Sequence, residues 1–199
     1  MKNNFNIENN VIILTGGSGN LGSIYAEYLI SNGAKVCNFD LTSPQDINKF
    51  DEKNYLFLKT DVTDKENISY SLKLVLEKFG CPQGLINNAA LDSPPGDSDV
   101  INGPFEDYPE EAWDKVIDVN LKSIFLTCQI IGKEMADNSG GSIINISSHY
   151  VLISPDQRIY NYRKNFYKPI SYSASKSGIF NICLLYTSQS TRDNRVSRM

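Results

Sequence analysis

Short apolar runs alternate along the chain with longer segments in which apolar residues recur every three or four positions. The short runs predict strands over 10–16, 34–40, 55–61, 84–90 and 140–148, and the first of them has the pattern of a buried strand. The longer segments predict helices over 20–33 and 65–80, a long helix from Pro109 toward Met135, and a further helix that begins at Tyr172. Strands that alternate with helices at this pace predict a parallel sheet with helices on both faces, the doubly wound α/β class.

The apolar spacing within 20–33 also predicts which side of that helix is buried. Leu21, Ile24, Tyr28 and Leu29 recur at helical spacing, and we expect them to form the apolar face. Asn32 and Gly33 then supply a stop signal at the end of the helix.

Composition and charge narrow the class of protein. A chain of 199 residues with 41% hydrophobic residues indicates one globular domain. A net charge of −4 argues against a nucleic-acid binder. The apolar runs are too short to span a bilayer, and the polar first ten residues lack the apolar core of a signal peptide. Four widely spaced cysteines and one histidine predict no metal site and favour a reducing, cytoplasmic location.

A glycine-rich segment, TGGSGNLG (15–22), lies between the first predicted strand and the first predicted helix. Gly17, Gly19 and Gly22 match the pattern G-x-G-x-x-G, which permits a tight turn and a close approach of backbone to a pyrophosphate. The helix that follows presents free N–H groups and the positive end of its dipole. The pattern alone is weak, but its place between a strand and a helix predicts dinucleotide binding.

Two aspartates follow the next predicted strands. Asp40 stands 18 residues after Gly22, where a carboxylate can accept hydrogen bonds from a ribose diol and would repel a 2′-phosphate. NAD is therefore favoured over NADP, although Asp40 also fits a solvated strand end. Asp61 fits either a helix cap or a partner of the adenine.

Tyr172 and Lys176 are four residues apart in a predicted helix and therefore share a face. A phenol is a weak base at neutral pH, but a nearby ammonium and a bound nicotinium ring favour the phenolate. Such a phenolate can exchange a proton with a substrate hydroxyl while hydride moves to or from the nicotinamide. A serine at the end of the preceding strand, Ser147 or Ser148, can hold the same oxygen.

Together these motifs resemble the short-chain dehydrogenase/reductase family over about residues 8 to 182. The likeness is carried by TGGSGNLG, Asp40, DV at 61–62, NNAA at 87–90, Asn120 in VNLKS, INISS and YSASK. The resemblance implies a Rossmann-type fold in a single domain, with NAD as cofactor and a homo-oligomeric full-length protein, a dimer or tetramer.

The resemblance also implies roles for individual residues. Tyr172 would be the acid/base, Lys176 its partner, and Ser148, in preference to Ser147, would orient the substrate oxygen. Asn120 would hold a water in the proton relay, although the residues alone favour a tolerated polar side chain. The positions that would contact NAD are Gly16, Gly17, Ser18, Gly19, Asn20, Leu21, Gly22, Asp40, Asp61, Val62, Asn88, Ala89, Ala90, Tyr172 and Lys176.

The glycine segment departs from the compact branch of the family at one position. That branch writes T-G-x-x-x-G-x-G, and Asn20 holds the place of the middle glycine. We expect the turn to survive because Asn tolerates positive φ better than most residues. The spacing of Gly16, Gly19 and Gly22 is closer to the sugar-nucleotide epimerase branch, whereas NNAA and YSASK favour the compact branch.

The long segment between Ser148 and Tyr172 is aromatic and basic. Because both of its ends are catalytic candidates, we expect it beside the substrate, with Arg158, Tyr160 and Arg163 in contact. Arg and Lys here outnumber the single Asp156, which suits a sugar with a phosphate or carboxylate. The segment is also similar to family members of bacterial surface-sugar and flagellin-glycan pathways. The alternative is a surface loop that packs on a neighbouring subunit.

The end of the chain is polar and contains few helix-forming residues. CLLYTSQSTRDNRVSRM also resembles translated sequencing-adapter read-through. We therefore expect an NAD-binding domain over 8–185, truncated after the fifth strand and the following helix, and a non-native tail over 186–199. A divergent native C-terminus is the alternative.

The leading hypothesis is an NAD-dependent oxidoreductase that interconverts a secondary alcohol and a ketone on a small polyol or sugar-like substrate. A nucleotide-sugar epimerase or dehydratase and a non-catalytic nucleotide-binding protein remain as alternatives.

Overall fold

The computed structural model describes residues 6–93, 101, 103–138, 140–162 and 166–187. Within the described part, contacts cluster into two compact units, of which the first contains 6–89 and 126–146 and the second contains 90–125 and 147–187. Each unit is described by itself. From residue 188 on, the predicted non-native tail lies outside the described residues.

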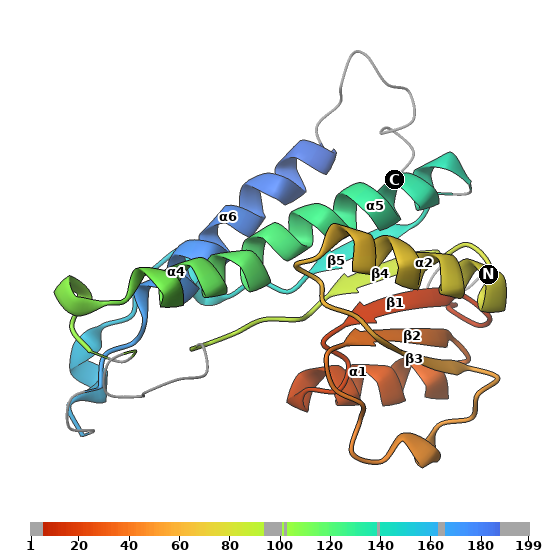
Figure 1. The fold of residues 1–199 in the computed structure, drawn as a ribbon, viewed down its shortest axis with the longest axis horizontal. Helices are drawn as coiled ribbons and strands as arrows, with labels where there is room; N and C mark the ends of the chain where they lie inside the picture. The colour runs from red at the N-terminus through yellow and green to blue at the C-terminus, as the bar shows by residue number, and fades with distance from the viewer. Residues whose placement is uncertain (1–5, 94–100, 102, 139, 163–165, 188–199) are drawn as a thin grey trace. The chain divides into compact units, whose positions relative to one another are not determined.

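The first unit is built on a parallel sheet of five strands. The strands are β1 (Val11–Thr15), β2 (Lys35–Asp40), β3 (Tyr55–Lys59), β4 (Gly84–Asn87) and β5 (Ser142–Asn145). They lie in the order β3-β2-β1-β4-β5 (Figure 1). The central strand β1 is buried along its whole length, which explains why its sequence is a continuous apolar run.

Helices cover both faces of this sheet. α1 (Asn20–Ser31) packs on one face, and α2 (Lys65–Phe79) packs on the other with α5 (Ser123–Asp137), whose residues from Leu126 onward belong to this unit. The short 3-10 helix η1 (Ile47–Lys49) lies before β3. The prediction of a doubly wound, Rossmann-type α/β fold is confirmed.

The predicted apolar face of α1 is mostly wrong. Leu21, Ile24 and Tyr28 are each more than half exposed, and only Leu29 of the predicted set packs against the core. The buried residues of the helix are Gly22 and Ala26. A Cβ at Gly22 would lie 2.7 Å from the Cα of Gly17, so the helix approaches the glycine turn too closely for a larger residue. Because of this close approach, the face of α1 that carries the small residues Gly22 and Ala26 packs inward.

The second unit consists of helices and short helical turns. These are η2 (Phe105–Asp107), α4 (Glu110–Ile117), the π-helical turn η3 (Asp118–Lys122), the first three residues of α5, η4 (His149–Val151), η5 (Gln157–Tyr160) and α6 (Ile170–Thr187). α4, η3 and η4 contact α6. A Cβ at Gly178 would lie 2.8 Å from a methyl group of Leu121, so α6 meets η3 closely.

The boundaries of two predicted helices need correction. The long helix begins at Glu110, because Pro109 is its N-cap, and a π-helical turn interrupts it around Asn120. α6 begins at Ile170, two residues before the predicted start at Tyr172. No helix in the described part of the chain is long and apolar enough to cross a membrane.

Candidate active site

The glycine turn of the first unit is held by backbone contacts. The N–H of Gly16 donates to the carbonyl of Phe39 (2.9 Å), and the N–H of Gly19 donates to the carbonyl of Gly16 (3.2 Å). Gly16 has φ +66°, and a Cβ there would lie 2.8 Å from the Cα of Ala89. Both its conformation and its space therefore require glycine.

Asn20 fits the turn for a reason other than the one the sequence indicated. It is the first residue of α1, and Asn9 is the one described non-glycine residue with positive φ. The middle position of the motif thus needs no positive φ in this chain. An Asn side chain is accommodated there as part of an ordinary first helical turn.

Asn38, which the sequence analysis did not single out, holds the turn by hydrogen bonds from β2. Its side chain is fully buried on β2 and accepts a hydrogen bond from the N–H of Gly17 (2.9 Å). Its amide nitrogen donates to the hydroxyls of Ser18 (3.0 Å) and Tyr55 (2.9 Å). A Cβ at Gly17 would lie 2.6 Å from Cγ of Asn38, so this amide explains the glycine. The available signal was a polar residue inside the apolar run VCNF.

Asp40 faces the same turn from the end of β2. One carboxylate oxygen accepts from the N–H of Ser18 (3.0 Å). The other accepts from the N–H (3.1 Å) and the hydroxyl (3.2 Å) of Thr42. The carboxylate is thus held at the turn, as a contact to a ribose there requires.

Asp61 is not the cap of the helix that follows it. The cap of α2 is Asp64, whose side chain accepts from the N–H of Asn67 (2.9 Å). Asp61 instead accepts from the N–H (2.8 Å) and the hydroxyl (2.7 Å) of Thr63. Its neighbour Val62 is buried in the core. The helix-cap interpretation of Asp61 is therefore wrong.

Residues after β4 bind back to the turn. The N–H groups of Asn88 (3.0 Å) and Ala89 (3.1 Å) both donate to the hydroxyl of Thr15. The side-chain amide of Asn88 also donates to the carbonyls of Thr15 (3.1 Å) and Gly16 (3.0 Å). These bonds couple the end of β4 to the turn. Ala90 is exposed and belongs to the second unit.

Tyr172 and Lys176 lie on one face of α6 in the second unit. The Nζ atom of Lys176 is 5.9 Å from the centre of the Tyr172 ring. Lys176 is only 2% exposed, and this burial lowers the pKa of its ammonium from 10.5 to about 8. The arrangement places a desolvated amine beside a partly exposed phenol.

The two serines after β5 are used differently. The hydroxyl of Ser147 donates to the carbonyl of Lys176 (3.2 Å) and so anchors the loop to α6. The hydroxyl of Ser148 accepts from the N–H of Tyr150 (3.2 Å) at the start of η4. A hydroxyl that accepts this bond still has its own proton to donate.

Asn120 lies at the π-helical turn and is fully buried. Its amide nitrogen donates to the carbonyl of Leu91 (2.8 Å) and the hydroxyl of Ser175 (3.0 Å), and its oxygen accepts from the N–H of Leu91 (2.7 Å). Ser175 in turn donates to the carbonyl of Tyr172 (2.8 Å). These contacts link Asn120 to the helix of Tyr172 and do not fit a merely tolerated polar residue.

Aromatic residues of the segment before α6 lie beside Tyr172. The ring of Tyr150 meets that of Tyr172 edge to face, with 6.4 Å between centres. The hydroxyls of Tyr150 and Tyr160 are 3.3 Å apart. This hydrogen bond, assisted by desolvation, raises the pKa of Tyr160 to about 12. Of the three predicted substrate residues, Tyr160 thus contacts Tyr150, whose ring packs against that of Tyr172.

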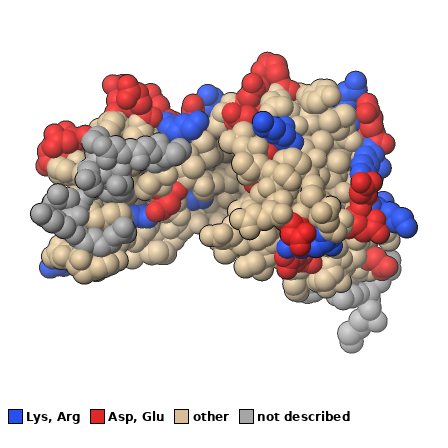
Figure 2. All heavy atoms as spheres, turned by 60° about the horizontal axis from the view of Figure 1, so that its bottom comes forward, with Lys and Arg blue, Asp and Glu red and all other residues tan. Residues whose placement is uncertain are grey.

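The other two predicted substrate residues are not brought there. Arg158 is an exposed side chain that pairs with Asp156 through Nη2 (2.7 Å) and Nε (2.9 Å). Arg163 lies outside the described residues. Lys168 is also paired, with Asp92. Two of the four basic residues of the segment are thus paired with carboxylates. Figure 2 shows both acidic and basic side chains on the face that it draws.

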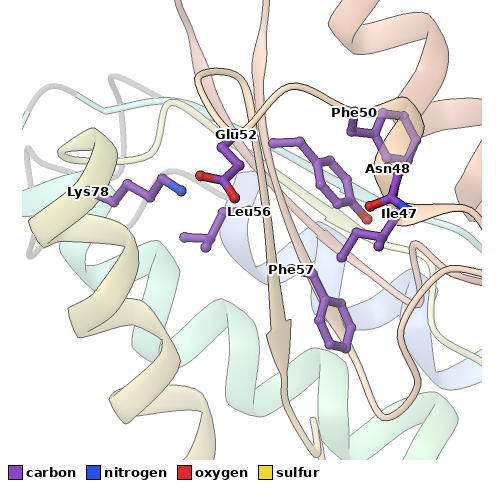
Figure 3. Close-up of a pocket in the computed structure, with 8 residues that line it drawn as sticks. Ile47, Asn48, Phe50, Glu52, Leu56, Phe57 and Lys78 are labelled. Carbon is purple, nitrogen blue, oxygen red and sulfur yellow. The ribbon is translucent and has the colours of Figure 1, made fainter.

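A separate hollow of about 410 Å³ lies at the outer edge strand β3 of the first unit (Figure 3). It is lined by Ile47, Asn48, Phe50, Glu52, Tyr55, Leu56, Phe57 and Lys78. None of the predicted catalytic or cofactor residues is among them. The chemistry of the candidate site is therefore not located in this hollow.

Known proteins are similar to this chain in both sequence and fold. Residues 10–193 match the family described as short chain dehydrogenase. An NAD-dependent glycerol dehydrogenase of Listeria innocua is 32% identical, with 88% of this chain and 62% of the relative covered. A sorbitol-6-phosphate 2-dehydrogenase of Klebsiella pneumoniae is 30% identical, with 72% and 53% covered.

A solved structure shows the same likeness. The crystal structure of a short chain dehydrogenase from Leptospira borgpetersenii with bound NAD+ has a TM-score of 0.77 and 26% identity, and the match covers 92% of this chain and 66% of the other. The chain therefore spans between half and two thirds of the length of these relatives.

Proposed function

Because the chain belongs to the short-chain dehydrogenase family, we propose that it acts as an NAD-dependent oxidoreductase that interconverts a secondary alcohol and a ketone. The observation that carries this proposal is the pair on α6, in which buried Lys176 lies beside Tyr172. A protein that only binds nucleotides has no need of a phenol next to a desolvated ammonium.

In the proposed reaction Tyr172 holds the proton. Its phenolate takes the proton from the substrate hydroxyl during oxidation, and its phenol returns the proton during reduction. The ammonium of Lys176 favours the charged form of the phenol, and the Ser148 hydroxyl donates a hydrogen bond to the same substrate oxygen. Asn120 and Ser175 hold this part of α6 in place through the hydrogen bonds described above. When bound, NAD would accept the hydride of the alcohol carbon.

The glycine turn fits the dinucleotide. Gly19 caps α1, and the one described atom within 4 Å of a Cβ there is the Gly16 carbonyl at 3.4 Å, so the space before the helix is open. The first N–H groups of a helix have no acceptors within it and favour a pyrophosphate. Asp40, fixed by Ser18 and Thr42, would accept hydrogen bonds from the ribose diol and repel the 2′-phosphate of NADP.

We propose a small polyol or sugar-like substrate. The relatives include proteins named as glycerol, sorbitol-6-phosphate and D-threitol dehydrogenases. Tyr150 and Tyr160 offer ring faces and hydroxyls beside Tyr172, which suits a polyhydroxylated molecule. Because Arg158 and Lys168, the two basic side chains that the structure describes in this segment, are both engaged in ion pairs, we favour an uncharged polyol over a phosphorylated one.

The test measures the reduction of NAD in the presence of each of a panel of polyols. The absorbance of the reduced nicotinamide reports the rate. Tyr172→Phe should lower kcat at least about a hundredfold, because proton transfer by a positioned side chain contributes about that much or more. The dissociation constant of NAD should change little. Tyr162→Phe makes the same chemical change at an exposed tyrosine of the same unit and should leave kcat unaltered. Equal rates in the Tyr172 variant and the wild type would refute the proposed role.

A further inference from the structure

A second ammonium group lies beside Tyr172, from the segment that precedes α6. The Nζ atom of Lys168 is 5.0 Å from the centre of the Tyr172 ring, closer than Nζ of Lys176 at 5.9 Å. Lys168 is four residues before Tyr172 and Lys176 is four residues after it. The phenol is therefore flanked by two lysines.

Three contacts fix the position of Lys168. Its N–H donates to the side-chain oxygen of Gln157 (2.8 Å), and its carbonyl accepts from the side-chain nitrogen of the same residue (3.1 Å). Its ammonium forms an ion pair with Asp92. The Lys168 side chain is 11% exposed, whereas that of Asp92 is 61% exposed. The ammonium is thus held near the ring, and its counter-ion reaches it from the solvent side.

We propose that Lys168 and Asp92 are a pair of positioning residues that set the pH range in which Tyr172 exchanges its proton. The inference rests on the proposed function of Tyr172 as acid/base. Lys168 favours the phenolate by its positive charge, and Asp92 offsets part of this effect by neutralising Lys168. The two residues therefore act on Tyr172 in opposite directions, which a purely structural role would not produce.

The other titratable groups near Tyr172 are the same in the wild type and in all the variants compared below. Lys176 is the one on α6 itself. Neighbouring elements contribute Tyr150 against the Tyr172 ring, Tyr160 and His149 against Tyr150, Tyr108 against Ser171, and the Asp118–Lys122 ion pair of η3. Because the variants below leave all of these groups in place, their contributions cancel in a comparison of pH profiles.

The first experiment measures how kcat/KM for alcohol oxidation depends on pH. Lys168→Gln should move the acid limb to higher pH, because loss of the cation disfavours the phenolate. Asp92→Asn should move it to lower pH, since the Lys168 charge is then no longer neutralised. The double variant should lie close to the wild type, and Lys168→Arg, which keeps the charge, should also match it.

Gln157→Ala supplies the structural control. It removes both hydrogen bonds that hold the Lys168 backbone but changes no charge. If Lys168 only kept the segment in order, Gln157→Ala would shift the acid limb as Lys168→Gln does. We expect Gln157→Ala to change KM or kcat. When Asp92→Asn is added to Gln157→Ala, the acid limb should still move to lower pH.

A second measurement needs neither cofactor nor substrate. The absorbance of tyrosinate is titrated in each protein and in its Tyr172→Phe counterpart, and the difference reports Tyr172 alone. The pH at the midpoint of this difference titration should be higher in Lys168→Gln and lower in Asp92→Asn than in the wild type. If no polyol is turned over, the proposed function fails while this titration still decides the inference. Identical midpoints in the wild type and both single variants would overturn it.

Discussion

Replacing Gly22 by alanine tests whether close packing of α1 against the glycine turn is required. The added Cβ would lie 2.7 Å from the Cα of Gly17 and closer still to the carbonyl oxygen of Gly16. Both obstacles are backbone atoms, and the Gly17 N–H is tied to buried Asn38, so neither can move cheaply. Alanine gains at most about 1 kcal/mol over glycine in a helix. Overpacking costs about 1–3 kcal/mol.

The cost of overpacking therefore exceeds the gain in helix propensity. We expect Gly22→Ala to lower the free energy of unfolding by about 2 kcal/mol, which is a cost near the top of the overpacking range reduced by that gain. Relief of the clash would displace the turn, so NAD affinity should fall as well. Both effects come from one cause, the distance between helix and turn.

Gly19→Ala is the matched control in the same turn. Gly19 has φ −76° and ψ 174°, which alanine adopts without strain, and the nearest described atom to its Cβ position is 3.4 Å away. The poorer N-cap preference of alanine opposes the lower entropy of its unfolded chain. Stability should thus stay within about 0.5 kcal/mol of the wild type. The methyl group would enter the space proposed for the pyrophosphate, and NAD affinity should fall about tenfold or more.

Urea unfolding gives the free energy of unfolding, and calorimetric titration gives the dissociation constant of NAD for both variants and the wild type. The expected pattern is a loss of stability in Gly22→Ala alone and a loss of affinity in both. A Gly22→Ala protein as stable as the wild type would show that the helix does not approach the turn as described. Unchanged affinity in Gly19→Ala would refute the placement of NAD at this turn.

Two further predictions concern charged residues. Between pH 8 and 10.5 the unfolded Lys176 still binds a proton that the folded chain has released, so the contribution of Lys176 to wild-type stability should rise with pH across this window by up to about 3 kcal/mol. Lys176→Met should remove that rise, and urea unfolding of both proteins at either end of the window measures it; parallel curves would contradict the burial of the charge. Asp40→Asn keeps one acceptor oxygen but removes the charge that repels a 2′-phosphate, so the ratio of NADP to NAD affinity should rise about tenfold or more. Titration of both cofactors measures the ratio, and an unchanged value would show that Asp40 does not select between them.

Local patterns in the sequence were enough to predict the sheet and to select candidate site residues. The continuous apolar run of β1 identifies a strand buried on both faces, and the glycines at 16–22 indicate a turn because glycine readily adopts the positive φ that Gly16 has. Tyr172 and Lys176 could be paired, since a spacing of four residues places two side chains on one helix face. These features depend on residues close together in the chain.

Tertiary contacts decided the features that join distant residues. The inward side of α1 depends on how the helix packs against the core, where Ala26 is buried while Ile24 and Tyr28 stay exposed, and the apolar spacing of the helix alone carries no information on that packing. In the sequence Asn38 is only a polar residue within an apolar strand. The fold explains it, because its side chain forms hydrogen bonds with Gly17, Ser18 and Tyr55.

The charged residues of the segment before α6 also show what the sequence determines and what only the fold decides. Composition alone counts Arg158 and Lys168 as cations available to a substrate, whereas the structure pairs Arg158 with Asp156 and Lys168 with Asp92. Asp92 lies 76 residues before Lys168, so no local pattern could have predicted their contact. The residue types and the helical periodicity therefore determined which groups the site has. The fold determined which of their charges are neutralised, because electrostatic effects depend on distances in space and not along the chain.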